Sequence, residues 1–325
     1  MQKKVDQLHA LLEEKIKEEQ YGEFPSELYE PIRYLMSLGG KRLRPILALL
    51  GYNLFKDDVE SIIDQSLAIE VFHNFTLMHD DIMDEAPIRR GKPTVHEKWN
   101  ANTAILSGDV MLVKAYDLLL DTPKKQLKPL LRIFNKCAAE VCEGQQLDML
   151  FESKSTVFEE EYIEMIRLKT AVLLGMSLEM GALLADADEK DTVALKQFGV
   201  NIGIGFQLKD DLLDVYADKA KFGKQVGGDI ISNKKTFLLI KALEKAEGNR
   251  KKELNRWLEA TDFDSKEKVK AVTAIYDELG IKELTEAKMN EYFDAGFAAL
   301  KKVKSSIYEK AYLKKFSEGL IDRQK

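Results

Sequence analysis

Apolar positions recur at three- and four-residue steps through most of the chain, and residues 68 to 82 show the spacing most clearly. The residues on it are Ala68, Val71, Phe72, Phe75, Met78 and Ile82. This spacing is typical of a helix with one buried face, and no segment alternates like a convincing strand. The pattern predicts an all-α protein with about a dozen helices.

Glycine and proline mark where these helices end. Gly39 and Gly40 follow a helical segment, Pro45 lies in the first turn of the next, and further breaks fall at 87–93, 121–123 and 218–235. No linker rich in proline, glycine or serine divides the chain, so residues 1–325 are predicted to form a single domain. Residues 252–325 are strongly charged and are predicted to be peripheral amphipathic helices.

Composition narrows the function classes. The chain is 45% hydrophobic and 32% charged, which is enough for a substantial core, and its net charge of −6 argues against a general nucleic-acid surface. Cys137 and Cys142 match neither a metal spacing nor a disulfide framework. The amphipathic N-terminus lacks the apolar core of a signal peptide, and no run of eighteen apolar residues occurs. A cytoplasmic protein is expected.

The chemistry-bearing feature is an acidic pattern, DDxxD, that occurs twice. Asp80, Asp81 and Asp84 form the first copy, and Asp210, Asp211 and Asp214 the second. Residues four apart lie above one another on a helix, so the carboxylates within each copy repel unless a cation separates them. Mg²⁺ fits, because it binds through one or two carboxylates and completes its shell with water and phosphate oxygens.

Basic residues accompany both acidic patterns. Arg89 and Arg90 follow the first, several lysines and glycines between 219 and 235 follow the second, and Lys41, Arg42 and Arg44 occupy a separate corner between helices. Carboxylates beside arginines and lysines describe a site for a metal-bridged phosphate or diphosphate. A charge run at a helix end is usually only solvated, and this remains the better interpretation for Lys219 or Lys221 alone.

In these motifs the chain resembles the all-α polyprenyl diphosphate synthases, the head-to-tail trans-prenyltransferases. The similarity runs in order from Gly39 to Lys234. It includes GGKRLRP, Glu70 to His73, both DDxxD patterns, Arg89-Arg90-Gly91, Gly108-Asp109, Gly144-Gln145, Lys169-Thr170, Phe206-Gln207, Gly223-Lys224 and Asn233-Lys234. The resemblance implies one large helical bundle, the isoprenoid synthase fold, around a deep central cavity, usually in a homodimer, with the acidic motifs on opposite walls.

The resemblance also implies roles for individual residues. Asp80, Asp84 and Asp210 would bind Mg²⁺, three ions per active site, and Asp81, Asp214, Gln145 and Asp148 would support them. The allylic diphosphate would be held by Arg89, Lys169 and Lys234, and that of isopentenyl diphosphate by Lys41, Arg44, His73 and Arg90. Lys224 would help to close a lid, while Thr170 and Gln207 would present oxygen atoms near the allylic cation.

The chemistry agrees with such a site. Breaking an allylic carbon–oxygen bond leaves a carbocation and a diphosphate, so catalysis chiefly requires stabilising the leaving group's negative charge. The double bond of isopentenyl diphosphate attacks the cation, and the released diphosphate can remove the last proton. The cavity must exclude water, which would capture the cation.

Product length depends on the floor of that cavity. The resemblance places it at Thr76, Phe75 and Phe72, which lie four, five and eight residues before Asp80. An ideal helix rises about 1.5 Å and turns about 100° per residue, which puts Phe72 near the aspartate face and Phe75 well off it. Two bulky residues predict a short product, farnesyl or geranylgeranyl diphosphate, made from a dimethylallyl, geranyl or farnesyl primer.

Several alternatives stay open. The chain could be a longer-chain synthase or a non-catalytic regulatory subunit of a heteromeric synthase, although such subunits commonly lose one aspartate motif. A terpene cyclase or a head-to-head synthase would leave GGKRLRP and Arg90 without a use. A pure interaction scaffold would leave the paired carboxylates without a cation.

Overall fold

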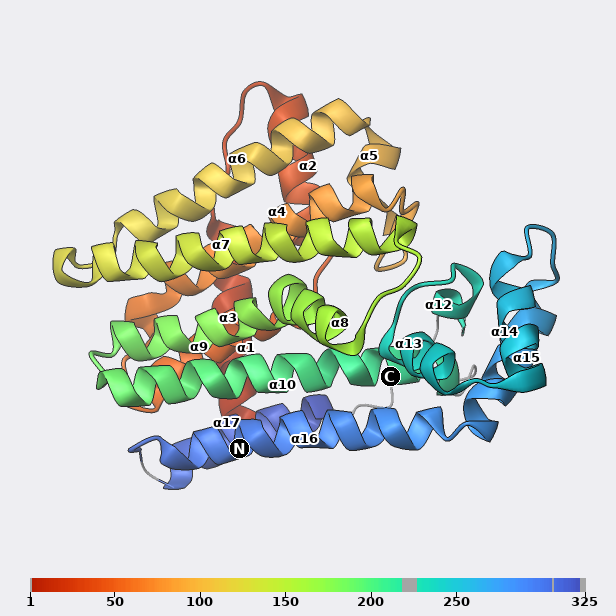
Figure 1. Ribbon diagram of the computed structural model, residues 1–325. Coiled ribbons are helices and arrows are strands. Elements are labelled where there is room, and N and C mark those ends of the chain that lie inside the picture. The colour runs from red at the N-terminus through yellow and green to blue at the C-terminus, as the bar shows by residue number, and fades with distance from the viewer. Residues whose placement is uncertain (1, 218–226, 306, 322–325) are drawn as a thin grey trace. The chain divides into compact units, whose positions relative to one another are not determined.

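The computed structural model describes residues 2–217, 227–305 and 307–321, and it shows an all-α fold (Figure 1). The predicted fold class is therefore confirmed. Among the helices of these residues, none combines the length and apolarity that crossing a bilayer requires. Lys224, the predicted lid residue, lies outside the described residues.

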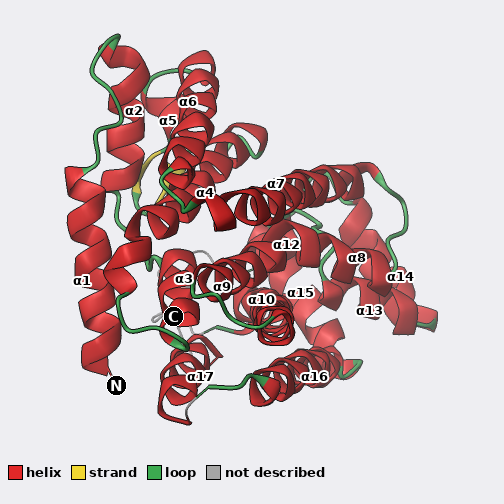
Figure 2. Ribbon diagram, turned by 90° about the vertical axis from the view of Figure 1, so that its left-hand side faces the viewer, coloured by secondary structure: helices red, strands yellow, loops and turns green. Residues whose placement is uncertain are grey.

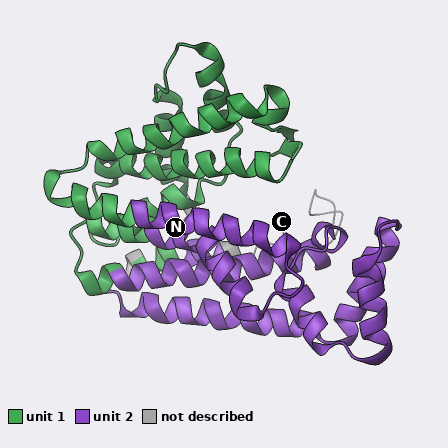
Figure 3. Cartoon of the chain, turned by 45° about the horizontal axis from the view of Figure 1, so that its top comes forward, with its two compact units in different colours: residues 1–134, 177–192, 305–313 green, residues 135–176, 193–304, 314–325 purple. Residues whose placement is uncertain are grey.

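The chain divides into two compact units (Figure 3), and each is described by itself. Unit 1 comprises residues 1–134, 177–192 and 305–313, and unit 2 comprises 135–176, 193–304 and 314–325. Within the described residues the boundary falls inside four helices, which are α7 (Lys124–Ser153), α9 (Val172–Leu184), α10 (Glu189–Tyr216) and α17 (Ile307–Ile321).

Unit 1 is built around α4 (Ile63–Met83), which is packed along α6 (Ala101–Leu120) and α3 (Leu43–Asn53). Its other complete helices among the described residues are α1 (Gln2–Glu18), α2 (Ser26–Ser37), η1 (Val59–Ile62) and α5 (Val95–Lys98). Ala68, Val71, Phe72 and Met78 are buried on α4, as their spacing predicts. The acidic residues lie at the C-terminal end of this helix, where burial gives way to solvent.

One short hairpin departs from the strand-free prediction. The strands β1 (Ile88–Arg89) and β2 (Lys92–Pro93) are antiparallel, with Arg89 opposite Lys92, and they are drawn in yellow in Figure 2. The two loop residues, Arg90 and Gly91, have φ angles of 51° and 76°. Two positive φ angles define a type I′ turn, which matches the natural twist of a hairpin. Strand periodicity cannot be read from two residues, so the hydrophobic pattern did not predict this hairpin.

Unit 2 combines the rest of the long helices with a series of shorter ones. These are α8 (Glu159–Ile166), the π-helical turn η2 (Arg167–Ala171), α12 (Gly228–Ile231), α13 (Phe237–Lys245), α14 (Gly248–Glu259), α15 (Ser265–Glu278) and α16 (Ile281–Lys302). The last helix, α17 (Ile307–Ile321), has residues in both units. The C-terminal helices are not merely peripheral, because Val272, Ile275, Tyr276 and Ile281 belong to a buried core.

Glycines set the helix spacing in unit 2. Figure 1 shows α16 running alongside α10, and a Cβ on Gly205 of α10 would meet the Phe293 ring of α16 at 2.5 Å. A Cβ on Gly199 would lie 2.7 Å from the Cα of Gly175 on α9. Backbones this close leave room for hydrogen alone, so larger residues would force α9 and α10 apart.

Candidate functional site

The first acidic motif separates its three aspartates by environment. Asp81 is buried and accepts two hydrogen bonds from Arg89, at 2.7 Å from Nε and 2.6 Å from Nη2. Asp80 is half-buried and Asp84 is exposed at the C-terminal cap of α4. Arg89 therefore neutralises Asp81, which leaves Asp80 and Asp84, one turn apart, as the carboxylates suited to a metal ion.

The type I′ turn sends the next arginine elsewhere. Arg90 donates a hydrogen bond from Nη1 to the Gly39 carbonyl, in the corner between α2 and α3. Its guanidinium lies so close to Gly40 that a Cβ there would be 3.0 Å from Nη2. Gly40 has a φ of 151°, which other residues rarely adopt, so glycine serves both the turn and the contact. Adjacent arginines thus reach two different places.

Arg90 meets a second cluster of predicted residues in this corner. Arg44 Nη1 lies 3.0 Å from His73 Nε2, and Lys41 is exposed in the same segment. Burial lowers the pKa of His73 well below its usual value, and the nearby charge of Arg44 lowers it further. His73 is therefore neutral and accepts from Arg44. The structure brings Lys41, Arg44, His73 and Arg90 to one basic corner.

Arg42 holds this corner in place, a role that sequence reasoning missed. Its side chain is buried and donates to Glu70 Oε1 at 2.8 Å, to Glu13 Oε1 at 2.8 Å and to the Met36 carbonyl at 2.9 Å. Glu70 stands on α4 one turn before His73 and Asn74. The ion pair joins the corner to the helix that carries the first acidic motif. The only sequence signal is the presence of both residues in the matched motifs.

In unit 2, two of the predicted residues lie on the π-helical turn. Lys169 Nζ is 2.6 Å from Asp148 Oδ2 of α7, and Thr170 Oγ1 donates to Gln207 Oε1 of α10 at 3.3 Å. A Cβ on Gly144 would lie 2.2 Å from the Lys169 backbone nitrogen, so α7 touches the turn directly. π-Helical turns are rare and often occur at functional sites. Helical periodicity does not reveal them.

The second acidic motif has one buried member as well. Asp211 accepts hydrogen bonds from Tyr162 Oη at Oδ2 and from Gln207 Nε2 at Oδ1, the latter at 3.3 Å. Burial raises the pKa of Asp211 to about 8, and the negative charge of the neighbouring Asp229 raises it further. The hydrogen bonds that Asp211 accepts from Tyr162 and Gln207 lower this pKa. Asp210 is half-buried on the same helix. Asp211 and Asp81 thus occupy equivalent buried places in their motifs.

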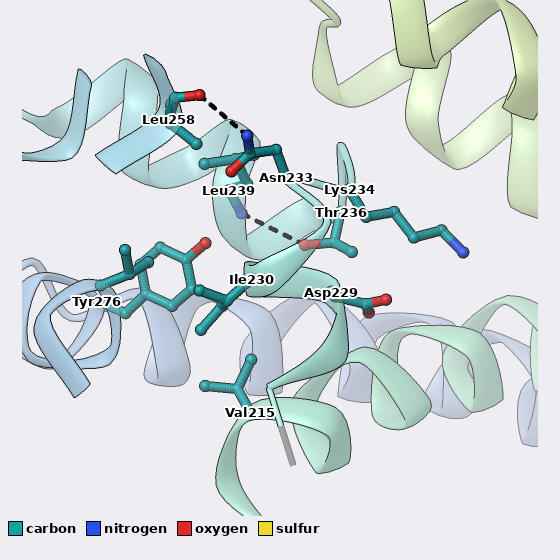
Figure 4. A pocket seen from close by; sticks show the side chains of 10 residues that line it. Val215, Asp229, Ile230, Asn233, Lys234, Thr236, Leu239, Leu258 and Tyr276 are labelled. Atoms are coloured by element: carbon teal, nitrogen blue, oxygen red, sulfur yellow. Dashed lines mark hydrogen bonds between the residues drawn. The ribbon is translucent and has the colours of Figure 1, made fainter. Parts of the chain in front are cut away.

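Asp214 and Lys234 belong to the segment around α12. Asp214 Oδ2 accepts from the Asp229 amide at 3.0 Å, and the Asp214 carbonyl accepts from the Gly227 amide at 2.6 Å. Asp229 and Lys234 project toward the same side of a small pocket with a volume of about 10 Å³, room for about one water molecule (Figure 4). Burial raises the pKa of Asp229 to about 6, and the charge of Lys234 opposes that rise. Asp214 therefore supports this segment.

Lys268 of α15 is a second residue that sequence reasoning missed. It is buried and donates to Asn233 Oδ1 at 2.7 Å and to the Ile231 carbonyl at 3.2 Å. Asn233 has a φ of 56°, and its amide donates to the Leu258 carbonyl at 3.0 Å. These bonds fix the turn that precedes Lys234. The sequence did not predict this contact, because nothing in the charged C-terminal region distinguishes Lys268 from the solvent-exposed lysines around it.

The remaining predicted residues are placed as follows. Gln145 is buried, and its Oε1 accepts no hydrogen bond within the described ranges. Phe72 is 1% exposed and packs on Phe134, with ring centroids 5.2 Å apart. Phe75 is half-buried and contacts the Phe72 ring at 5.8 Å, and Thr76 Oγ1 donates to the His73 carbonyl at 2.9 Å. Of the two phenylalanines, Phe75 is the more accessible.

The carboxylates fit Mg²⁺ in one specific way. In residues 2–217, 227–305 and 307–321, no three His, Cys, Asp or Glu side chains gather closely enough to hold a metal ion by themselves. Each acidic motif offers a pair one helical turn apart, and its buried central aspartate is hydrogen-bonded to a basic or polar partner. That donor set suits an ion that takes one or two carboxylates and further oxygens from water and phosphate.

Comparison with known proteins shows the family of this chain. The sequence profile described as polyprenyl synthetase matches residues 25–276. The short chain isoprenyl diphosphate synthase of Methanocaldococcus jannaschii is 43% identical over 235 residues, 72% of each chain. The geranylgeranyl pyrophosphate synthase of Geoglobus acetivorans is 44% identical over 236 residues, 72% of this chain and 74% of its own.

A solved structure extends the similarity over nearly the whole length. The crystal structure of geranylgeranyl pyrophosphate synthetase from Pyrococcus horikoshii matches with a TM-score of 0.91 and 35% identity, covering 98% of this chain and 97% of that one. The resemblance in the motifs is thereby confirmed. This chain belongs to the polyprenyl synthetase family.

Proposed function

We propose that this protein is a prenyltransferase that joins isopentenyl diphosphate to an allylic diphosphate and releases diphosphate. The observation that carries the proposal is the divergence of Arg89 and Arg90. One arginine reaches the first acidic motif and the next reaches the basic corner of Gly39 to Arg44. Two anion sites flanking one turn suit a reaction of two diphosphate substrates, whereas a terpene cyclase needs only one.

In this proposal the allylic diphosphate occupies the acidic motifs. Asp80 and Asp84, together with Asp210, would hold Mg²⁺, three ions per site by family resemblance, and Arg89, Lys169 and Lys234 would contact the diphosphate. Bound Mg²⁺ supplies positive charge that stabilises the leaving diphosphate. Arg89 keeps Nη1 outside its two bonds to Asp81, so it can bridge the motif and a phosphate oxygen. Lys169 would exchange its contact with Asp148 for the substrate.

Isopentenyl diphosphate would bind at the basic corner. Lys41, Arg44 and Arg90 provide three cations there, and neutral His73 can donate a hydrogen bond from its other ring nitrogen. The cavity floor would consist of Phe75, with Phe72 packed behind it and Thr76 beside it. Two aromatic rings in this position support a short product of farnesyl or geranylgeranyl length.

The surface of α6 supports the expected homodimer. Leu106, Val113 and Leu120 follow one another at seven-residue steps and are exposed by 58%, 59% and 59%. A stripe of this kind on one helix face is the surface that a second helix covers. The single domain, the deep cavity and the cytoplasmic location likewise remain predictions from sequence.

Aspartate variants test the proposal. Asp80→Asn with Asp84→Asn is expected to lower kcat for prenyl elongation by about 10²–10³-fold, because charge stabilisation of the leaving group is lost. Asp262→Asn, at an exposed carboxylate outside the motifs, is the matched control and should keep wild-type turnover. Undiminished kcat in the double variant would contradict the proposed site.

A further inference from the structure

A chain of buried and partly buried hydrogen bonds leads from α8 to the reacting end of the proposed site. Tyr162 of α8 is 2% exposed, and its hydroxyl donates to Asp211 Oδ2 on α10. The other oxygen of Asp211 accepts from Gln207 Nε2 at 3.3 Å. Gln207 Oε1 in turn accepts from Thr170 Oγ1 at 3.3 Å. Four side chains from three elements thus form one continuous path.

This path fixes which way the Gln207 amide points. With Asp211 ionised, as the hydrogen bonds donated to it by Tyr162 Oη and Gln207 Nε2 require, both of its oxygens accept, so the Gln207 amide directs its nitrogen to Asp211 and its oxygen to Thr170. An amide carries negative partial charge on oxygen and positive partial charge on nitrogen. If the amide turned over, it would present its positive end toward Thr170.

We propose that Tyr162 is a positioning residue, which holds Asp211 so that the Gln207 carbonyl faces the developing allylic cation. The inference rests on the proposed function, which places Gln207 and Thr170 beside that cation. Tyr162 does not touch the substrate in this account. It keeps the dipole of the Gln207 amide oriented before the positive charge forms, so that the site does not have to reorganise during the reaction.

The position of Tyr162 is itself well fixed. Glu159, at the start of α8, forms ion pairs with Lys241 of α13 at 2.5 Å and with Lys288 of α16 at 3.1 Å. The Tyr162 ring lies in a buried cluster with Met165, Ile204 and Leu208. α8 leads directly into the π-helical turn that carries Lys169 and Thr170. A hydroxyl on this helix is therefore a rigid anchor for the path.

The first test removes only the hydroxyl. Tyr162→Phe is expected to lower kcat by about 10–100-fold, the usual loss for a partner that orients a ligand from behind, with KM for both substrates within about twofold. Tyr52→Phe is the matched control, because Tyr52 is 3% exposed and donates to Asp58 Oδ1 at 2.9 Å, in unit 1. It loses an equivalent bond and should keep wild-type kcat.

A double-mutant cycle shows whether Tyr162 acts through Gln207. In a Gln207→Leu background, Tyr162→Phe should change kcat by less than about twofold, because the group that it orients is gone. A purely structural role would give the same loss in both backgrounds. That additive result, or wild-type kcat in Tyr162→Phe alone, would overturn the inference.

Asp211→Asn provides a second variant of nearly unchanged size, should Tyr162→Phe not fold. The asparagine oxygen can still accept from Tyr162, so its NH₂ faces Gln207 and favours the reversed amide. We expect kcat to fall at least as far as in Tyr162→Phe, and wild-type kcat would again overturn the inference. If the wild-type protein shows no prenyl elongation at all, the proposed function fails, and the inference with it.

Discussion

At the scale of single residues, the same solution appears in both acidic motifs. The central aspartate is buried and committed to a protein partner, Arg89 for Asp81 and Tyr162 for Asp211, while the flanking carboxylates stay more accessible. Burying a carboxylate is costly unless hydrogen bonds satisfy it. The motif residues could be predicted from sequence. Which of them is buried could not, because helix spacing brings both the first and the second aspartate of each motif near the third and does not say which of them finds a protein partner.

The lowered pKa of His73 can be tested through the pH dependence of protein stability. Its pKa is lowered in the folded protein by burial and by Arg44, so protonation below the unfolded value of about 6.5 favours unfolding. As pH falls from about 6.5 to 5.5, the free energy of unfolding of the wild type should decline relative to His73→Gln by up to about 1.4 kcal/mol per pH unit. Urea unfolding at several pH values measures the difference.

The pH dependence of wild-type stability alone would not isolate His73, so wild type is compared with His73→Gln. Asp211 and Asp229 have raised pKa values, about 8 and about 6, so they bind protons in the folded state and add stability as pH falls. Both contribute equally to wild type and to His73→Gln, and they cancel in the difference. A difference that does not change with pH would show that His73 titrates normally.

At the scale of elements, close backbone approach decides how the site is built. The apolar spacing predicts a helix over residues 68–82, followed by a break at 87–93, and this segment lies within α4. The spacing predicts neither the hairpin nor the π-helical turn. Gly144 illustrates why, since a glycine inside a helix pattern signals only a small loss of helix propensity. In the structure this position requires glycine because the backbone of Lys169 lies directly against Gly144.

Substitution of Gly144 tests this packing. A Cβ would lie 2.2 Å from the Lys169 nitrogen, and backbone cannot move aside as a flexible side chain can. Gly144→Ala should therefore lower the free energy of unfolding by about 1–3 kcal/mol and reduce turnover by displacing Lys169. Gly319→Ala is the control, because nothing beyond the adjacent backbone of α17 itself lies within 4 Å of its added Cβ. Equal effects at both positions would contradict the packing argument.

At the scale of the whole molecule, the predicted site residues fall into two groups with distinct surroundings. Unit 1 carries the first acidic motif and the basic corner, and unit 2 carries the second motif, Lys169, Thr170, Gln207 and Lys234. The sequence could name these residues through their motifs. It could not assign Arg42 and Lys268 their structural roles, because the sequence does not distinguish a buried cation from a solvated one.

Product length is a property of the cavity as a whole. Phe72 packs on Phe134, while Phe75 is half-buried, so we expect Phe75→Ala to lengthen the product more than Phe72→Ala. The double variant should yield the longest chains, because removing the first ring exposes the second. Chromatography of dephosphorylated products measures this. Unchanged chain length in the double variant would show that the floor lies elsewhere.

We propose above all that this chain elongates an allylic diphosphate by isopentenyl units in the presence of Mg²⁺. The most direct measurement is product chromatography after incubating the protein with Mg²⁺, isopentenyl diphosphate and a dimethylallyl, geranyl or farnesyl primer, each with an EDTA control. We expect Mg²⁺-dependent products that end at farnesyl or geranylgeranyl length. Absence of elongation with all three primers would contradict it.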